Sequence, residues 1–219
     1  MNKSCIFVLK LLTKFSITIK FHIMKQILTI LLISVCISAT SQTLEGFMGI
    51  KFGASSETVK HTMSARPECR LNKQYSTEES LAFEGAMFAG RQTAIILFSF
   101  VNNKFHTASV FIIPSLESEA IELFNTIKEE LDEKYFSTRE YFETYKYPYE
   151  KGDGYTESAI KQGKASFIAF WAFQDADSSN KNFISLEIGK SLSIIITYQD
   201  GNLIKEASML AKEKNYKDY

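Results

Sequence analysis

The chain has 219 residues, with 25 Lys and Arg against 25 Asp and Glu, and its formal net charge is therefore zero. Residues 1–41 hold five of the Lys and no acidic residue, so the remaining chain has 20 basic and 25 acidic residues, a net charge of −5. A balance of this kind excludes the strongly basic surface by which proteins bind nucleic acid or anionic membranes.

Residues 24–41 have the pattern of a secretory signal peptide. Lys25 supplies a positive start, residues 27–37 (ILTILLISVCI) form an apolar run, and residues 39–41 are small. The run is shorter than the roughly 20 residues that a membrane-spanning helix needs. The pattern predicts export across the cytoplasmic membrane to the periplasm or the extracellular space, with Gln42 as the first residue of the mature protein.

Residues 1–23 come before this signal and are apolar but interrupted by lysines. We expect translation to begin at Met24, which makes residues 1–23 an upstream extension; a long, basic start to the signal is the alternative. N-terminal sequencing of the exported protein distinguishes the two. Lipid anchoring at Cys36 is disfavoured because Val35 stands where a small residue is required. Export leaves Cys69 as the only thiol, so the fold must rest on its hydrophobic core.

Residues 42–219 begin with a predicted strand at 47–52 and a helix capped by Ser55 or Ser56, which Pro67 ends. Val59 and Met63, four residues apart, would face the core. Apolar runs at 80–90, 93–101 and 104–113 predict three antiparallel strands, the last two joined at Asn102-Asn103.

A second group of helix and strands begins at Ser115, which we expect to cap a long amphipathic helix that runs to Tyr135. Glu130 and Lys134 are spaced for an i,i+4 ion pair on its polar side. Strands are predicted at 165–173, 182–189 and 192–198, and a closing helix from Asn202. The chain therefore predicts one α+β domain, mainly antiparallel sheet with helices packed on one face, in two tandem halves, 42–114 and 115–219.

The stretch GIKFGASSETVKHTMSARP, followed by the hairpin FSFVNNKFHTASVF, resembles small exported bacterial proteins of the beta-lactamase-inhibitor-protein-like type. Gly53, Val59 and Pro67 fit that pattern, while the long gap between Pro67 and the hairpin departs from it. The resemblance covers about 60 residues, and its superfamily includes a small lipoprotein of the outer-membrane assembly machinery. It implies protein binding by a sheet face without catalysis, and it assigns no functional residue.

Residues that could carry chemistry are few. His61 lies on the polar side of the first predicted helix, and His106 lies in a strand, where alternation places it beside Ala108 and Val110. The chain has no HExxH, CxxC, GxSxG or phosphate-binding glycine loop. His106 is better interpreted as a half-buried sheet residue than as a base, and Cys69 as an inert thiol. A small hydrolase that uses His106 is the alternative.

The loop QDADSSNKNFISLE places Asp175, Asp177 and Ser179 at the spacing of a calcium loop. Leu186 stands where the bidentate Glu is expected, and strands rather than helices flank the loop. A polar hairpin loop is therefore favoured over a calcium-steadied module, and we predict no cofactor and no metal.

The segment YFSTREYFETYKYPYEKGDGY is the best candidate binding surface. In an extended chain Tyr141, Tyr145, Tyr147 and Tyr149 share one face, and Pro148 places such a strand at a sheet edge. Tyr is enriched at binding surfaces, although tyrosines that merely cover the sheet edge give the same pattern. The sequence predicts an exported, non-catalytic module that binds an envelope protein or a glycan.

Overall fold

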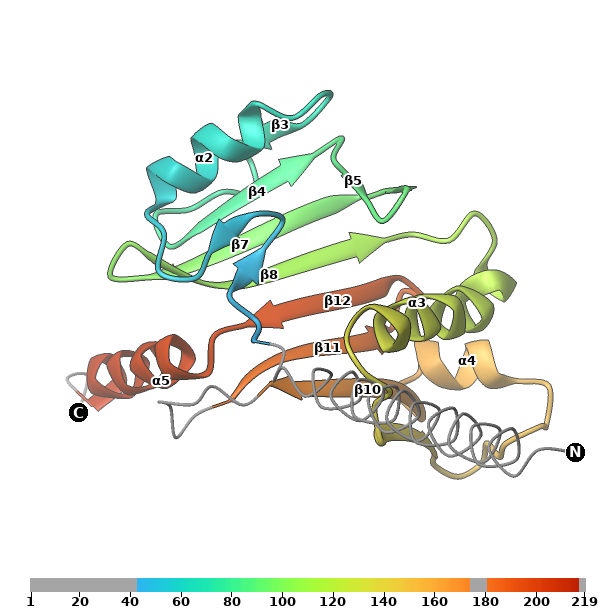
Figure 1. The fold of residues 1–219 in the computed structure, drawn as a ribbon. Coiled ribbons are helices and arrows are strands. Elements are labelled where there is room, and N and C mark those ends of the chain that lie inside the picture. The colour runs from blue at the N-terminus through green and yellow to red at the C-terminus, as the bar shows by residue number, and fades with distance from the viewer. Residues whose placement is uncertain (1–42, 174–180, 217–219) are drawn as a thin grey trace, which may run out of the picture. The chain divides into compact units, whose positions relative to one another are not determined.

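An eight-stranded antiparallel sheet organises the structure, a computed structural model that describes residues 43–173 and 181–216 (Figure 1). Helices pack against this sheet, which confirms the predicted α+β class. From one edge to the other the strands are β3 (Arg70–Asn72), β4 (Ser80–Glu84), β7 (Ile95–Val101), β8 (Lys104–Ile112), β12 (Ile194–Gln199), β11 (Asn182–Ile188), β10 (Ala165–Phe173) and β9 (Glu140–Tyr145).

Two short hairpins and five helical segments complete the described part of the chain. The hairpins pair β1 (Gly46–Phe47) with β2 (Ile50–Lys51) and β5 (Met87–Phe88) with β6 (Arg91–Gln92). The helical segments are α2 (Ser56–Ser64), the 3-10 turn η2 (Glu117–Glu119), α3 (Ala120–Lys134), α4 (Thr156–Lys161) and α5 (Gly201–Tyr216).

The same order of elements occurs twice. In each half a helix precedes a four-stranded antiparallel meander: α2 before β3, β4, β7 and β8, then α3 before β9, β10, β11 and β12. The two meanders join through their last strands, because β8 pairs with β12. The predicted tandem order is therefore present, and each half has one strand more than the three that its apolar runs predict.

The first helix forms as its sequence predicts. The Ser55 hydroxyl accepts a hydrogen bond from the Thr58 amide at 3.3 Å, and Val59 and Met63 are both buried. The strand expected over residues 47–52 is instead the β1–β2 hairpin, because Met48 and Gly49 turn the chain with φ of 51° and 80°. That turn places Phe47 in the core.

The long helix differs from its prediction at its start. Ser115 does not cap it; η2 comes first, and the Glu119 carboxylate accepts a hydrogen bond from the Leu116 amide at 3.1 Å. A carboxylate in this position satisfies an amide that the first turn leaves free. The apolar stripe itself is as expected, since Phe124, Ile127 and Leu131 are buried.

The predicted ion pair between Glu130 and Lys134 is wrong. Glu130 instead accepts two hydrogen bonds from the Arg91 guanidinium, at 2.6 and 2.8 Å, and this contact ties the β5–β6 hairpin to α3. The Lys134 ammonium lies 4.9 Å from the centre of the Tyr135 ring. A bidentate partner from a distant hairpin replaces the local pair because it satisfies both carboxylate oxygens.

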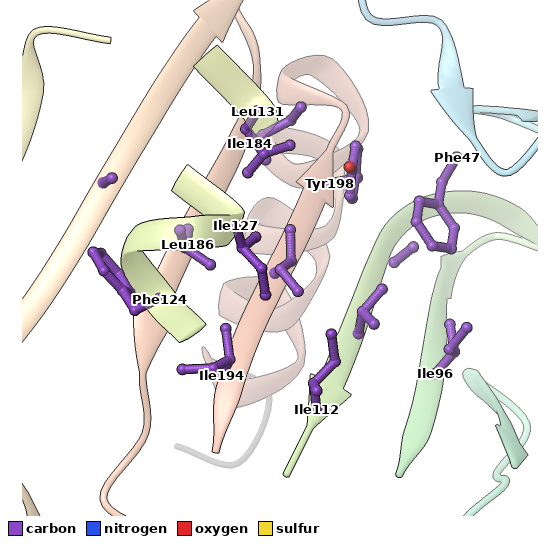
Figure 2. Packing of buried hydrophobic residues seen from close by; sticks show 14 of the residues in the cluster. Phe47, Ile96, Ile112, Phe124, Ile127, Leu131, Ile184, Leu186, Ile194 and Tyr198 are labelled. Carbon is purple, nitrogen blue, oxygen red and sulfur yellow. The ribbon is translucent and has the colours of Figure 1, made fainter. Parts of the chain in front are cut away.

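The core lies between the sheet and α2, α3 and α4. Figure 2 shows side chains of β8, β11 and β12 gathered with those of α3, while Ile96 of β7 and Phe47 of the β1 hairpin lie farther from that helix. Trp171 is fully buried, and its indole N–H donates to the Asp132 carboxylate of α3 at 2.9 Å. We call this side of the sheet the covered face and the opposite side the open face.

The last helix, α5, contacts β7, β8 and β11 instead of joining the main core. The Asp200 carboxylate caps it by accepting a hydrogen bond from the Leu203 amide at 2.8 Å. Its predicted apolar face is only partly used, since Leu203 and Ala207 are half-buried while Leu210 and Ala211 are exposed. Helix α5 therefore covers one end of the open face and leaves the rest uncovered by any described helix.

Candidate functional site: the open face of the sheet

A row of apolar side chains crosses the open face. The strand register aligns one residue from each of six neighbouring strands, and five of the six are apolar: Ile95, Phe111, Ile195, Glu187, Ile168 and Phe142. Each is half-buried or exposed, and Phe142 is 47% exposed at the edge of the sheet. We call this set the apolar row.

The neighbouring row shows what a covered sheet position looks like in this protein. It is shifted by one residue along the strands and points to the covered face, and it consists of Ile96, Val110, Ile196, Leu186, Ala169 and Tyr141. The first five are completely buried. The strands are thus apolar on both sides, a pattern typical of sheets that are packed on both faces.

The second row of the open face is more polar at its centre. Ser109 and Thr197 share a hydrogen bond of 3.3 Å between their hydroxyls, and Leu97 lies on the other side of Ser109. Towards the sheet edge the Phe170 ring lies 6.3 Å from the Phe142 ring, nearly edge to face. Aromatic contacts therefore continue the apolar row toward β9.

His106 lies on the open face, which corrects its predicted placement beside Ala108. Ser99 pairs with Thr107 and Phe100 pairs with Phe105, so His106 is the extra residue of a β-bulge. The bulge turns its ring into a groove of about 650 Å³ under α5. An imidazole nitrogen lies 2.8 Å from the Thr107 hydroxyl.

Burial lowers the pKa of His106, and the Asp200 carboxylate offsets part of that effect through its charge. The imidazole is therefore neutral at pH 7. The Asp200 amide donates a hydrogen bond to the His106 carbonyl oxygen at 2.9 Å, but the Asp200 carboxylate caps α5 and makes no hydrogen bond to the imidazole. Within the part of the chain that the structure describes, His106 thus has no carboxylate positioned to orient it as a general base.

Two of the four candidate tyrosines, Tyr141 and Tyr145, lie on β9, which is an edge strand as predicted, although Pro148 lies beyond its end. Their hydroxyls donate to the Glu143 carboxylate at 3.3 and 3.1 Å, and Lys151 completes the cluster at 2.7 Å from Glu143. Burial raises the pKa of Tyr141 to about 12, and the charge of Glu143 adds to the shift. Burial alone would raise the pKa of Glu143, but the hydrogen bonds from Lys151 and Tyr145 lower it overall.

The other two tyrosines follow the end of the strand. Strand β9 stops at Tyr145, so Tyr147 and Tyr149 lie outside it and the four tyrosines do not form one extended face. Tyr147 is 91% exposed, whereas Tyr149 is half-buried and accepts a hydrogen bond from the Gln162 amide. The protein's own contacts hold Tyr141, Tyr145 and Tyr149, and Tyr147 projects into solvent.

The structure describes two of the remaining candidates, Cys69 and His61. Cys69 is buried, and burial raises the pKa of its thiol, with the nearby Arg66 charge opposing the shift. His61 is exposed on α2. The calcium-loop candidates Asp175, Asp177 and Ser179 lie outside the described residues. Over residues 43–173 and 181–216, no three His, Cys, Asp or Glu side chains gather as metal ligands would.

The apolar row was missed in the sequence, although the signal is there. The runs AIILF, SVFII and SIIIT have apolar residues at successive positions, so each strand offers apolar side chains to both faces. Interpreting these runs only as core strands hides the fact that, among the described helices, only α5 covers the open face, and only at one end.

Comparison of the chain with protein-family models, with curated proteins and with solved structures finds no match in any of the three. Among the described residues, no helix combines the length and the apolar character that crossing a bilayer requires. The candidate site therefore rests on its geometry: a broad, half-exposed apolar surface, one acidic side chain near its middle and a groove under α5 at one end.

Proposed function

We propose that this protein is an exported, non-catalytic binding module and that its open sheet face docks another protein of the cell envelope. The observation that carries the proposal is the apolar row, which crosses six strands with Glu187 as its one charged member. A contiguous exposed apolar surface usually marks a site of interaction with another molecule.

The chemistry of the row favours a protein partner over a glycan. Ile95, Ile168 and Ile195 offer no hydrogen-bonding group, and they fit apolar side chains from a second protein. Glu187 adds a fixed negative charge near the centre of the row, which a Lys or Arg of the partner would match. The partner surface we expect is therefore apolar with a central basic residue. The sheet-face binding implied by the sequence resemblance is of the same kind.

Two alternatives have less support. A hydrolase that uses His106 would need a carboxylate to orient the imidazole. The carboxylate whose charge acts on the pKa of His106 is Asp200, and it caps α5 instead. The tyrosine edge offers Tyr147 as a free aromatic side chain, while Tyr145 and Tyr149 are half-buried and hydrogen-bonded within the protein. The open face offers the larger continuous surface.

Site-specific photocrosslinking tests this proposal. A photoreactive phenylalanine analogue placed at Phe111 or Phe142 should capture a defined protein from an envelope extract. The same analogue at Tyr75, which is 59% exposed on a loop away from the row, should not capture that protein. Glu187→Lys should abolish the crosslink from Phe111, since it places a positive charge opposite the expected basic residue.

A matched series separates the two candidate surfaces. Tyr147 takes the same analogue, and capture from Tyr147 alone would move the binding surface to the tyrosine edge. Equal capture from Phe111 and Tyr75, or capture from Phe111 that Glu187→Lys leaves unchanged, would contradict docking at the open face.

A further inference from the structure

A second cavity lies on the covered face, where the two halves of the molecule meet. It has a volume of about 360 Å³, within the range of small-ligand sites. We call it the seam pocket, since the first half lines it with Met48, Arg66, Met87 and Phe88, and the second half lines it with Ile127, Leu131, Lys134 and Tyr198. Ligand pockets are common at such junctions between units.

The inner part of the seam pocket is apolar and adaptable. Ile127 and Leu131 of α3 are buried, and Tyr198 closes the pocket with only 2% of its surface exposed. Met48 and Met87 come from two separate hairpins, and Met87 is 51% exposed at the rim. Methionine side chains are unbranched and flexible, so they shape themselves around an alkyl chain without strain.

The polar part of the pocket carries two cations, Arg66 and Lys134, for which the described residues provide no ion-pair partner. Arg66 is half-buried and donates one hydrogen bond, at 2.6 Å, to the carbonyl oxygen of Met48. No carboxylate of the described residues lies within ion-pair distance of Arg66 or of Lys134, and the Arg66 Nε atom is buried without an acceptor. Glu130, the acid that lines the same pocket, is already taken by Arg91.

A half-buried guanidinium without an anion is unfavourable, because it loses hydration and gains no charge partner. A carboxylate restores the balance, since a guanidinium and a carboxylate form strong, directional hydrogen bonds. A ligand that fits both parts of the pocket therefore has one anionic head and one apolar tail.

We propose that the seam pocket binds a small anionic amphiphile, a carboxylate with an unbranched alkyl chain such as a medium-chain fatty acid. Arg66 and Lys134 hold the head group, and Met48, Met87, Ile127 and Leu131 surround the chain. This site is separate from the apolar row, on the other side of the sheet, and it does not depend on docking at the open face.

Titration calorimetry with octanoate, decanoate and dodecanoate, each below its micelle concentration, tests the proposal. We expect saturable one-to-one binding of decanoate and much weaker binding of decanol, which lacks the charge. Arg66→Gln should weaken decanoate binding about ten-fold to a hundred-fold, the effect of losing a charge-assisted hydrogen bond. Lys134→Gln, at an exposed position, should weaken it several-fold.

Three controls make the outcome decisive. Arg70→Gln removes an exposed arginine from β3 and should leave decanoate affinity unchanged. Ile195→Ser, on the open face, should also leave it unchanged, so failure of one site is separable from failure of the other. Met87→Trp should fill the rim of the pocket and abolish decanoate binding. This variant tests the pocket independently of Arg66→Gln, in case that substitution unfolds the protein.

The proposal is overturned by any of three results: no saturable binding of any of the three carboxylates, equal affinity for decanoate and decanol, or decanoate affinity that survives both Lys134→Gln and Met87→Trp. Thermal melts of each variant show whether it is folded at the titration temperature.

Discussion

The two faces of the central sheet have nearly the same chemistry and different surroundings. Ile195 and Ile196 are neighbours on β12, yet Ile196 is completely buried under the helices while Ile195 is half-exposed in the apolar row. The strand therefore does not determine which side becomes core; the helices α2, α3 and α4 do. The part of the apolar open face that α5 leaves uncovered by the described helices is the surface that we propose docks a partner.

The largest expected effect comes from comparing these two neighbours directly. Ile196→Ala should lower the free energy of unfolding by about 2–5 kcal/mol, because it leaves a cavity in the core. Ile195→Ala should cost about 1 kcal/mol, since little cavity forms at a half-exposed site. Urea denaturation measures both. An equal loss of unfolding free energy in the two variants would mean that Ile195 is as buried in solution as Ile196. The two faces of the sheet would then not differ in burial.

Asp132 on α3 provides a test of how this helix is held against the covered face. Its carboxylate accepts hydrogen bonds from the Trp171 indole, the Lys128 ammonium and the Thr138 amide. Asp132→Ala should cost about 1–3 kcal/mol, because it leaves the buried indole N–H without a partner. Asp132→Asn keeps an acceptor and should cost less.

The pH dependence of the same carboxylate sharpens this test. Burial alone would raise the pKa of Asp132, but the hydrogen bonds from Lys128, Thr138 and Trp171 lower it below its ordinary 3.8. The unfolded state therefore binds the proton more readily, so the stabilisation is complete above pH 3.8 and is lost as the pH falls through the folded-state pKa. Acid titration of wild type and Asp132→Asn should show a steeper loss in the wild type. Parallel curves would contradict this role.

A smaller effect is expected on the open face, at His106. Burial holds the pKa of His106 below its ordinary 6.5, so between that folded-state pKa and 6.5 the unfolded chain binds more protons. Stability should therefore fall as the pH drops from 7 toward 5, and His106→Gln should flatten that fall. Melting temperatures at the two pH values check this. A decrease of the same size in both proteins would show that His106 does not titrate in this way.

The smallest effect is expected at Tyr147, which belongs to neither face. Tyr147→Ala should change the free energy of unfolding by less than about 0.5 kcal/mol, because the side chain is 91% exposed. Tyr145→Phe, which removes the hydrogen bond to Glu143, should cost about 0.5–1.5 kcal/mol. Urea denaturation of the pair ranks them. A larger loss for Tyr147→Ala would reveal a structural role for that exposed ring.

Much of the fold follows from local patterns. The run at 165–173 is β10 residue for residue, and the Asn102-Asn103 turn joins β7 and β8 as expected. The short strand β3 and the six-residue helix α4 were not predicted, because neither has a long apolar period. Strand β3 is fixed by pairing with β4, and α4 by its contacts with β10. Local propensity does not report packing contacts of this kind.

The candidate site was harder to predict for two physical reasons. Alternation assigns a face only while the register holds, and the β-bulge at His106 reverses that assignment for one residue. The seam pocket needs Arg66 and Lys134 to come together from separate halves. The tyrosine edge was located correctly on β9, but the turn after Tyr145 separates its four members.

The pairing of β8 with β12 has a consequence for how the chain reaches this state. Ser109 and Thr197, which face each other across that ladder, are separated by 88 residues. During synthesis the strands of the first meander leave the ribosome long before β12 does. Until β12 pairs with it, β8 is an exposed sheet edge with apolar side chains on both faces. A nascent or unfolded chain with such an edge is vulnerable to aggregation, so we expect a holding chaperone to improve its yield.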